Sequence, residues 1–98
     1  MKVLAIMALA PSADISEMGR LLRDELLGSW ALFCENVLRE AYLTEDRARA
    51  IFISEAETSG AARAQLDRLP LVRDGTFTVQ LIELHPFVNW QRLFAEST

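Results

Sequence analysis

Stretches with strand character and stretches with helix character follow one another along this chain in the order strand, helix, strand, strand, helix, strand. The strand stretches are residues 3–9, 37–44, 49–56 and 76–84. Right-handed crossovers place both helices of such a split arrangement on one face of a single sheet. We therefore predict an α+β, ferredoxin-like βαββαβ fold, with an antiparallel sheet whose first and third strands lie in the middle.

The two helices are marked by caps and by apolar spacing. Asp14 and Glu17 form an acidic variant of a capping box, which predicts the start of the first helix. The apolar residues that follow recur at intervals of three and four, as on one face of a long helix: Ile15, Met18, Leu22, Leu26, Trp30 and Phe33. The second helix is expected to begin at Thr58 or Ser59 and to end at Pro70; its inward residues would be Ala62, Leu66 and Leu69.

The two central strands are apolar on both of their faces, and this constrains the assembly. Two helices can cover only one face of the sheet, so the other face would leave a large apolar area in water. A second sheet packed against that face removes the area from water. We therefore predict a homodimer, a dimeric α+β barrel, with a higher oligomer left open. Residues 87–94 should add a short amphipathic helical tail.

Length and charge restrict the remaining possibilities. The 98 residues suffice for one domain, which we place at residues 1–98. The net charge is −4, and the arginines are scattered among acids rather than gathered in a basic stripe. This argues against nucleic acid and against an anionic membrane as partners. The apolar stretch near the N-terminus is shorter than a signal peptide usually is and is interpreted as a strand, so we expect a cytoplasmic protein.

The sequence contains no recognisable binding motif for a metal ion or a nucleotide cofactor. The chain has one histidine and one cysteine, which give no zinc-type ligand spacing. It also lacks a glycine-rich phosphate loop. We therefore expect no cofactor, and we expect any partner other than a second copy to be a small organic ligand.

The candidate site residues are polar groups that interrupt apolar surfaces. Glu25 lies beside the apolar face of the first helix, where burial would raise its pKa and suit it to proton transfer. The alternative is an edge residue whose carboxylate reaches solvent. Glu40 and Tyr42 point the same way on one strand and could move a proton and hold a carbonyl. They could equally form a rim contact that protects an edge strand.

Four further residues complete the candidate set. His85, the single histidine, lies at the end of the last strand and could act as an acid or base, or it could be an exposed turn residue. Arg39 and Gln80 could contact a substrate from the strands. Trp90, in the aromatic tail, could line a pocket for a flat ligand or form part of an interface.

Three stretches make the chain similar to the muconolactone isomerase family of small dimeric α+β barrels. The first is Arg23-Asp24-Glu25, where that family carries an Asp-Glu pair. The second is the hairpin of residues 37–56, which keeps an arginine at Arg39. The third is Leu69-Pro70-Leu71, followed by a strand and His85-Pro86. The resemblance runs from the first strand to Pro86.

The resemblance implies a cofactor-free isomerase that shifts a double bond in a small unsaturated lactone acid by moving a proton between carbons. It points to Glu25 as the base, with help from His85. The chain departs from the family at Leu26, where a lysine is expected, and at Glu40 and Tyr42, where the family has His and Trp. Two alternatives stay open. One is a non-catalytic module for ligand binding or assembly, and the other is a cofactor-independent monooxygenase of the same barrel type.

Overall fold

The computed structural model describes residues 1–95. Its elements are β1 (Lys2–Leu9), α1 (Ile15–Cys34), β2 (Leu38–Leu43), β3 (Arg49–Glu55), α2 (Ser59–Leu66), α3 (Pro70–Arg73), β4 (Phe77–Leu84), η1 (Val88–Gln91) and α4 (Arg92–Ala95). The βαββαβ order predicted from the sequence is confirmed. The short helix α3 is an addition to it.

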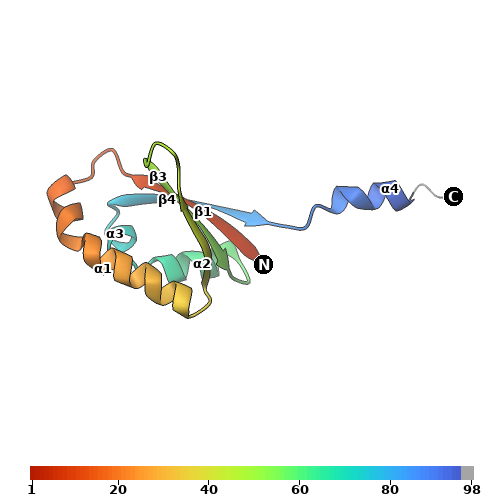
Figure 1. The fold of residues 1–98 in the computed structure, drawn as a ribbon, viewed down its shortest axis with the longest axis horizontal. Helices are drawn as coiled ribbons and strands as arrows, with labels where there is room; N and C mark the ends of the chain where they lie inside the picture. The colour runs from red at the N-terminus through yellow and green to blue at the C-terminus, as the bar shows by residue number, and fades with distance from the viewer. Residues whose placement is uncertain (96–98) are drawn as a thin grey trace.

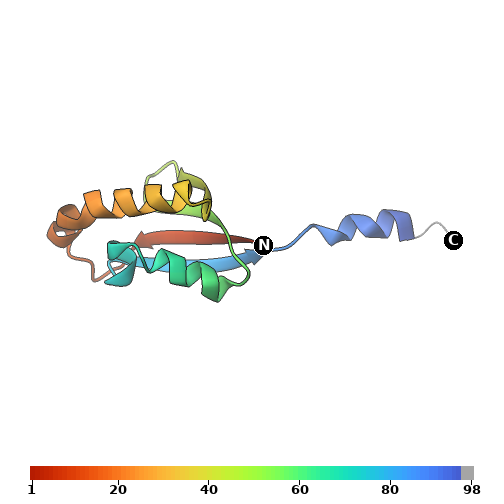
Figure 2. The same cartoon turned by 90° about the horizontal axis from the view of Figure 1, so that it is seen from below.

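One four-stranded sheet organises the chain. The strand order is β2-β3-β1-β4, and all three pairings are antiparallel. β1 and β3 therefore occupy the centre, as predicted from their apolar character. Helices α1, α2 and α3 all lie on the same side of this sheet (Figures 1 and 2). The ferredoxin-like fold class is thus confirmed.

The core lies between that side of the sheet and the helices. Alternate residues of β1 point into it, and Val3, Ala5 and Met7 are almost completely buried. The residues predicted to point inward from the second helix region, Ala62, Leu66 and Leu69, are buried as well. One boundary differs from the prediction. α2 already ends at Leu66, and Pro70 begins α3, because a proline lacks the N–H that the first turn of a helix leaves unpaired.

Helix α1 presents a different face to the core from the one that its apolar spacing suggested. Leu26 and Trp30, on the predicted face, are 60% and 63% exposed. The buried residues of α1 are Glu25 and Leu32. Gly28, between them, explains this orientation, since a Cβ added there would lie 2.9 Å from the side chain of the buried Leu69. The missing side chain lets α1 approach the α3 region closely. The apolar face of α1 that carries Leu26 and Trp30 is then turned away from the core and stays exposed.

The side of the sheet away from the helices, the open face, is apolar at its centre. The strand registers place Leu4 between Ile53 and Ile82. They place Ile6 between Ile51 and Gln80. These residues alternate with the core residues of the same strands, so they point away from the helices. No element of residues 1–95 covers them (Figure 1).

The C-terminal segment forms an arm that extends away from the sheet. Residues 87–95 include η1 and α4 and project beyond the end of β4 (Figures 1 and 2). Its large apolar side chains are exposed: Phe87, Val88, Trp90, Leu93 and Phe94. The helical tail is therefore confirmed, but residues 1–86 do not cover its large apolar side chains. None of the helices formed by residues 1–95 has the length and apolar character to cross a membrane.

Candidate functional site

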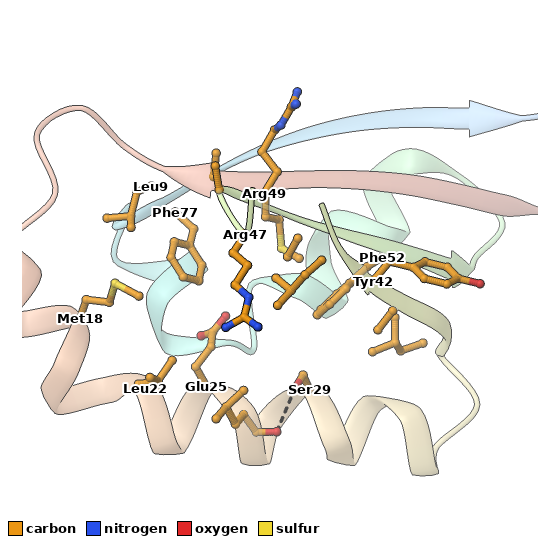
Figure 3. A pocket seen from close by; sticks show the side chains of 18 of the residues that line it. Leu9, Met18, Leu22, Glu25, Ser29, Tyr42, Arg47, Arg49, Phe52 and Phe77 are labelled. Atoms are coloured by element: carbon orange, nitrogen blue, oxygen red, sulfur yellow. Dashed lines mark hydrogen bonds between the residues drawn. The ribbon is translucent and has the colours of Figure 1, made fainter. Parts of the chain in front are cut away.

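A cavity of about 810 Å³ opens between α1 and the neighbouring part of the sheet. Its walls are mainly apolar. The residues that line it include Met18, Leu22, Glu25, Leu26, Ser29, Trp30, Phe52 and Phe77. The apolar residues of α1 that do not enter the core form one wall, and β1, β2, β3, the turn between β2 and β3, and the start of β4 form the other (Figure 3). This volume falls in the range usual for pockets that bind small molecules.

Glu25 is the buried acid of this cavity. Its residue surface is only 6% exposed, and its side chain projects from α1 toward the sheet (Figure 3). The backbone N–H of Leu71 donates a hydrogen bond of 2.8 Å to Glu25 Oε1. Oε2 accepts no hydrogen bond from any residue among 1–95, so it is the oxygen left for a ligand. Of the two interpretations left open by the sequence, the structure therefore supports burial rather than exposure at the helix edge.

Burial is the main influence on the acidity of Glu25. Loss of solvation disfavours the charged form and raises the pKa of its carboxyl above the ordinary value of 4.5. The hydrogen bond from Leu71 opposes this effect in part, because it stabilises the carboxylate. The charge of Asp74 adds to the rise, and Arg73 reduces it. A carboxyl with a raised pKa is protonated more readily than an ordinary glutamate, which suits a group that takes up and returns a proton.

Glu40 and Tyr42 lie together, but on a different surface. The register pairs them with Ile53 and Ile51, which places both side chains on the open face. The Tyr42 hydroxyl donates a hydrogen bond of 2.6 Å to Glu40 Oε1, and this bond raises the pKa of the phenol. Tyr42 borders the cavity, but its hydroxyl points away from it (Figure 3).

The remaining candidates lie outside the cavity of their own chain. Arg39 is exposed at the irregularity of β2, and Gln80 is exposed on the open face. His85 follows β4, at the end opposite Phe77, about 25 Å along the strand. Its Nε2 atom is 3.9 Å from Glu83. Trp90 packs edge-on against Phe87 in the arm. Within one chain, the structure thus does not bring these residues together with Glu25.

Three polar residues that line the cavity were missed by the sequence reasoning: Ser29, Arg47 and Arg49. Ser29 follows Glu25 by one turn of α1, and its hydroxyl donates to the carbonyl of Leu26 at 2.9 Å. Arg47 enters the cavity from the turn between β2 and β3 (Figure 3). Ser29 could have been identified from the sequence, because it follows Glu25 by four residues and so lies on the same face of α1. No local sequence pattern indicated that the turn between β2 and β3 lies over α1. Among residues 1–95, no three His, Cys, Asp or Glu side chains gather as metal ligands would.

Comparison with known proteins gives matches at the level of structure. The sequence matches no family model and no curated protein. The structure is similar to that of muconolactone isomerase, with a TM-score of 0.70, 20% identity, and coverage of 89% of this chain and 93% of that one. It is also similar to 5-chloro-2-hydroxyhydroquinone dehydrochlorinase from Burkholderia phenoliruptrix in complex with 2,5-dihydroxybenzoquinone. That match has a TM-score of 0.66, 15% identity, and coverage of 87% and 94%.

These identities support a shared fold. The resemblance to muconolactone isomerase that the sequence suggested is therefore borne out in the fold of the chain, over nearly its whole length.

The buried carboxyl generates a prediction for stability. Between the ordinary and the raised pKa, the folded chain binds more protons than the unfolded chain, so the free energy of unfolding falls as pH rises. Glu25→Gln cannot ionise, and its amide oxygen can still accept from Leu71. We expect this variant to melt higher than wild type at about pH 8, and the difference to shrink as pH falls toward the ordinary pKa.

Thermal melts across this pH range measure the effect. Asp24→Asn, which removes one charge from the exposed neighbouring position, serves as the control and should not reproduce it. A Glu25→Gln variant that melts below wild type at about pH 8 would show that the carboxylate is stabilised, not penalised, by its surroundings.

Proposed function

We propose that this protein is a cofactor-free isomerase, which moves a proton between two carbons of a small unsaturated lactone or a related cyclic carbonyl compound. The observation that carries the proposal is the buried Glu25 carboxyl, which has a raised pKa and faces an apolar cavity. The printed names of the two similar structures support the substrate class, since both refer to small ring compounds.

Glu25 would act first as a base and then as an acid. In its ionised form, Oε2 takes a proton from one end of the conjugated system of the ring carbonyl, which is the α-carbon of a β,γ-unsaturated lactone or the γ-carbon of an α,β-unsaturated one. The electron pair left behind forms a dienolate. The protonated carboxyl then returns the proton to the other end of this system, which moves the double bond. Burial favours the neutral intermediate form of the acid, and the apolar walls exclude water that would compete for the proton.

Turnover of muconolactone and related enol-lactones tests the proposal. We expect wild type to convert at least one of them, and Glu25→Gln to lower the rate by about 10²–10⁴-fold, the usual contribution of a general acid–base group. Because Glu25 returns the proton that it took while water is excluded, NMR in deuterated water should show that most of the product made by wild type carries no deuterium. Asp24→Asn, on the same helix but facing solvent, should keep wild-type activity.

The same assay separates the alternatives. Tight binding of a lactone without conversion, seen by native mass spectrometry, would instead favour a ligand-binding module. Oxygen consumption with a quinol would favour a monooxygenase. Equal turnover by wild type and Glu25→Gln would contradict the role of Glu25.

We further propose that two copies pair through their open faces. The rows of apolar side chains around Leu4 and Ile6 are uncovered in one chain, and soluble proteins rarely leave such an area in water. The exposed aromatic arm supports the same pairing, because it has apolar surface to bury and extends beyond its own sheet. Pairing of this kind could bring Glu40, Tyr42, His85 and the contact residues Arg39, Gln80 and Trp90 toward the other copy's cavity.

Light scattering after size-exclusion chromatography measures the assembly. We expect wild type to be at least dimeric at micromolar concentration. Ile51→Glu, which places a charge in the middle of the open face, should produce a folded monomer. Ala64→Glu adds the same charge to the exposed surface of α2 and should leave the assembly intact. A wild-type protein that stays monomeric would contradict the pairing.

A further inference from the structure

The turn between β2 and β3 is held in one conformation by its own side chains. Thr44 Oγ1 donates to Asp46 Oδ1 at 2.6 Å, and the backbone N–H of Ala48 donates to the same oxygen at 2.9 Å. The N–H of Arg47 donates to the carbonyl of Thr44 at 2.8 Å. This network fixes the position from which the Arg47 side chain leaves the hairpin.

Arg47 occupies a backbone conformation that is unusual for its type. Its φ is 61°, in the left-handed region that favours glycine or asparagine. Asn36, at the end of α1, shares this conformation and is a residue type that tolerates it. An arginine at such a position costs stability, which indicates that the side chain serves a purpose other than forming the turn.

The side chain reaches into the cavity and is not neutralised there. Figure 3 shows the Arg47 guanidinium pointing down from the hairpin toward the level of Glu25 and Ser29. Arg49 also borders the cavity, but its guanidinium points in the opposite direction. Within residues 1–95, the Arg47 side chain makes no ion pair and no hydrogen bond. Three other arginines are paired with carboxylates: Arg20 with Glu17, Arg63 with Asp67, and Arg68 with Glu35.

We propose that Arg47 binds the carboxylate of a small cyclic organic acid whose ring lies in the cavity against Glu25. The planar guanidinium can hold a carboxylate with two parallel hydrogen bonds. Its position across the cavity from Glu25 would separate the two tasks of anchoring the anion and exchanging the proton. The ring would lie on the apolar wall between them. This inference rests on the proposed function, and what it adds is the residue that would hold the carboxylate of the lactone acid that the resemblance implies.

Binding of benzoate and of benzamide, its neutral analogue of equal size, tests this role without turnover. The backbone amide NMR signals of Ser29 and Phe77 report occupation of the cavity. We expect wild type to bind benzoate at least about tenfold more tightly than benzamide, the preference that one charge-assisted pair of hydrogen bonds provides. Arg47→Gln should bind the two equally, and Arg47→Lys should keep part of the preference.

Arg49→Gln is the matched control, since it removes the same charge from a side chain whose guanidinium points in the opposite direction, and it should keep the full preference. All three variants should melt close to wild type. The proposal is overturned if wild type does not prefer benzoate, if Arg47→Gln keeps the preference, or if inorganic phosphate shifts the same signals as strongly as benzoate does. Glu25→Gln should keep the preference for benzoate over benzamide, because the preference comes from Arg47, so loss of isomerase activity and loss of carboxylate recognition remain distinguishable.

Discussion

The Glu25 carboxyl, held by the N–H of Leu71 at 2.8 Å and almost completely removed from water, is the feature to which the other parts of the site are tied. It links α1 to the start of α3. Gly28 allows the close approach of α1 on which this link depends. With that face buried, the apolar residues of α1 cannot also enter the core, so Leu26 and Trp30 line an open cavity. The same orientation of α1 therefore buries the Glu25 carboxyl, which costs solvation energy, and leaves apolar side chains free to form the walls of the cavity.

The sheet imposes the second constraint. Its helices cover one face and leave the apolar rows on the other face uncovered, and the proposed pairing of two copies would cover them. Glu40 and Tyr42 belong to this open face, and His85 and the arm lie beyond the end of β4. The polar groups of the chain are thus divided between an internal cavity, which needs no partner, and surfaces whose role depends on a second copy. Three charged residues line the cavity of a single chain, Glu25, Arg47 and Arg49, and of these the Arg49 guanidinium points the other way from Arg47.

The order of the elements could be predicted from the sequence, because the spacing of apolar residues in each helix and strand is a local signal. The central position of β1 and β3 then followed from right-handed crossovers and agreed with their apolar character on both faces. The sequence did not predict the rotation of α1. Apolar spacing favoured the face that carries Leu26, and only the contact between Gly28 and Leu69, forty-one positions apart, selects the other face. Glu25 was identified as a candidate because it lies beside that apolar face. Arg47 was missed because its place over the cavity depends on how the hairpin packs across α1, which no local pattern records.

The central claim is that burial, rather than the hydrogen bond from Leu71, controls the protonation of Glu25. An NMR titration of the Glu25 side-chain carboxyl carbon, assigned by comparison with Glu25→Gln, measures this directly in the whole chain. Our account predicts a pKa above the ordinary value of 4.5. A titration midpoint at or below that value would contradict it, because burial would then not control the protonation of the carboxyl.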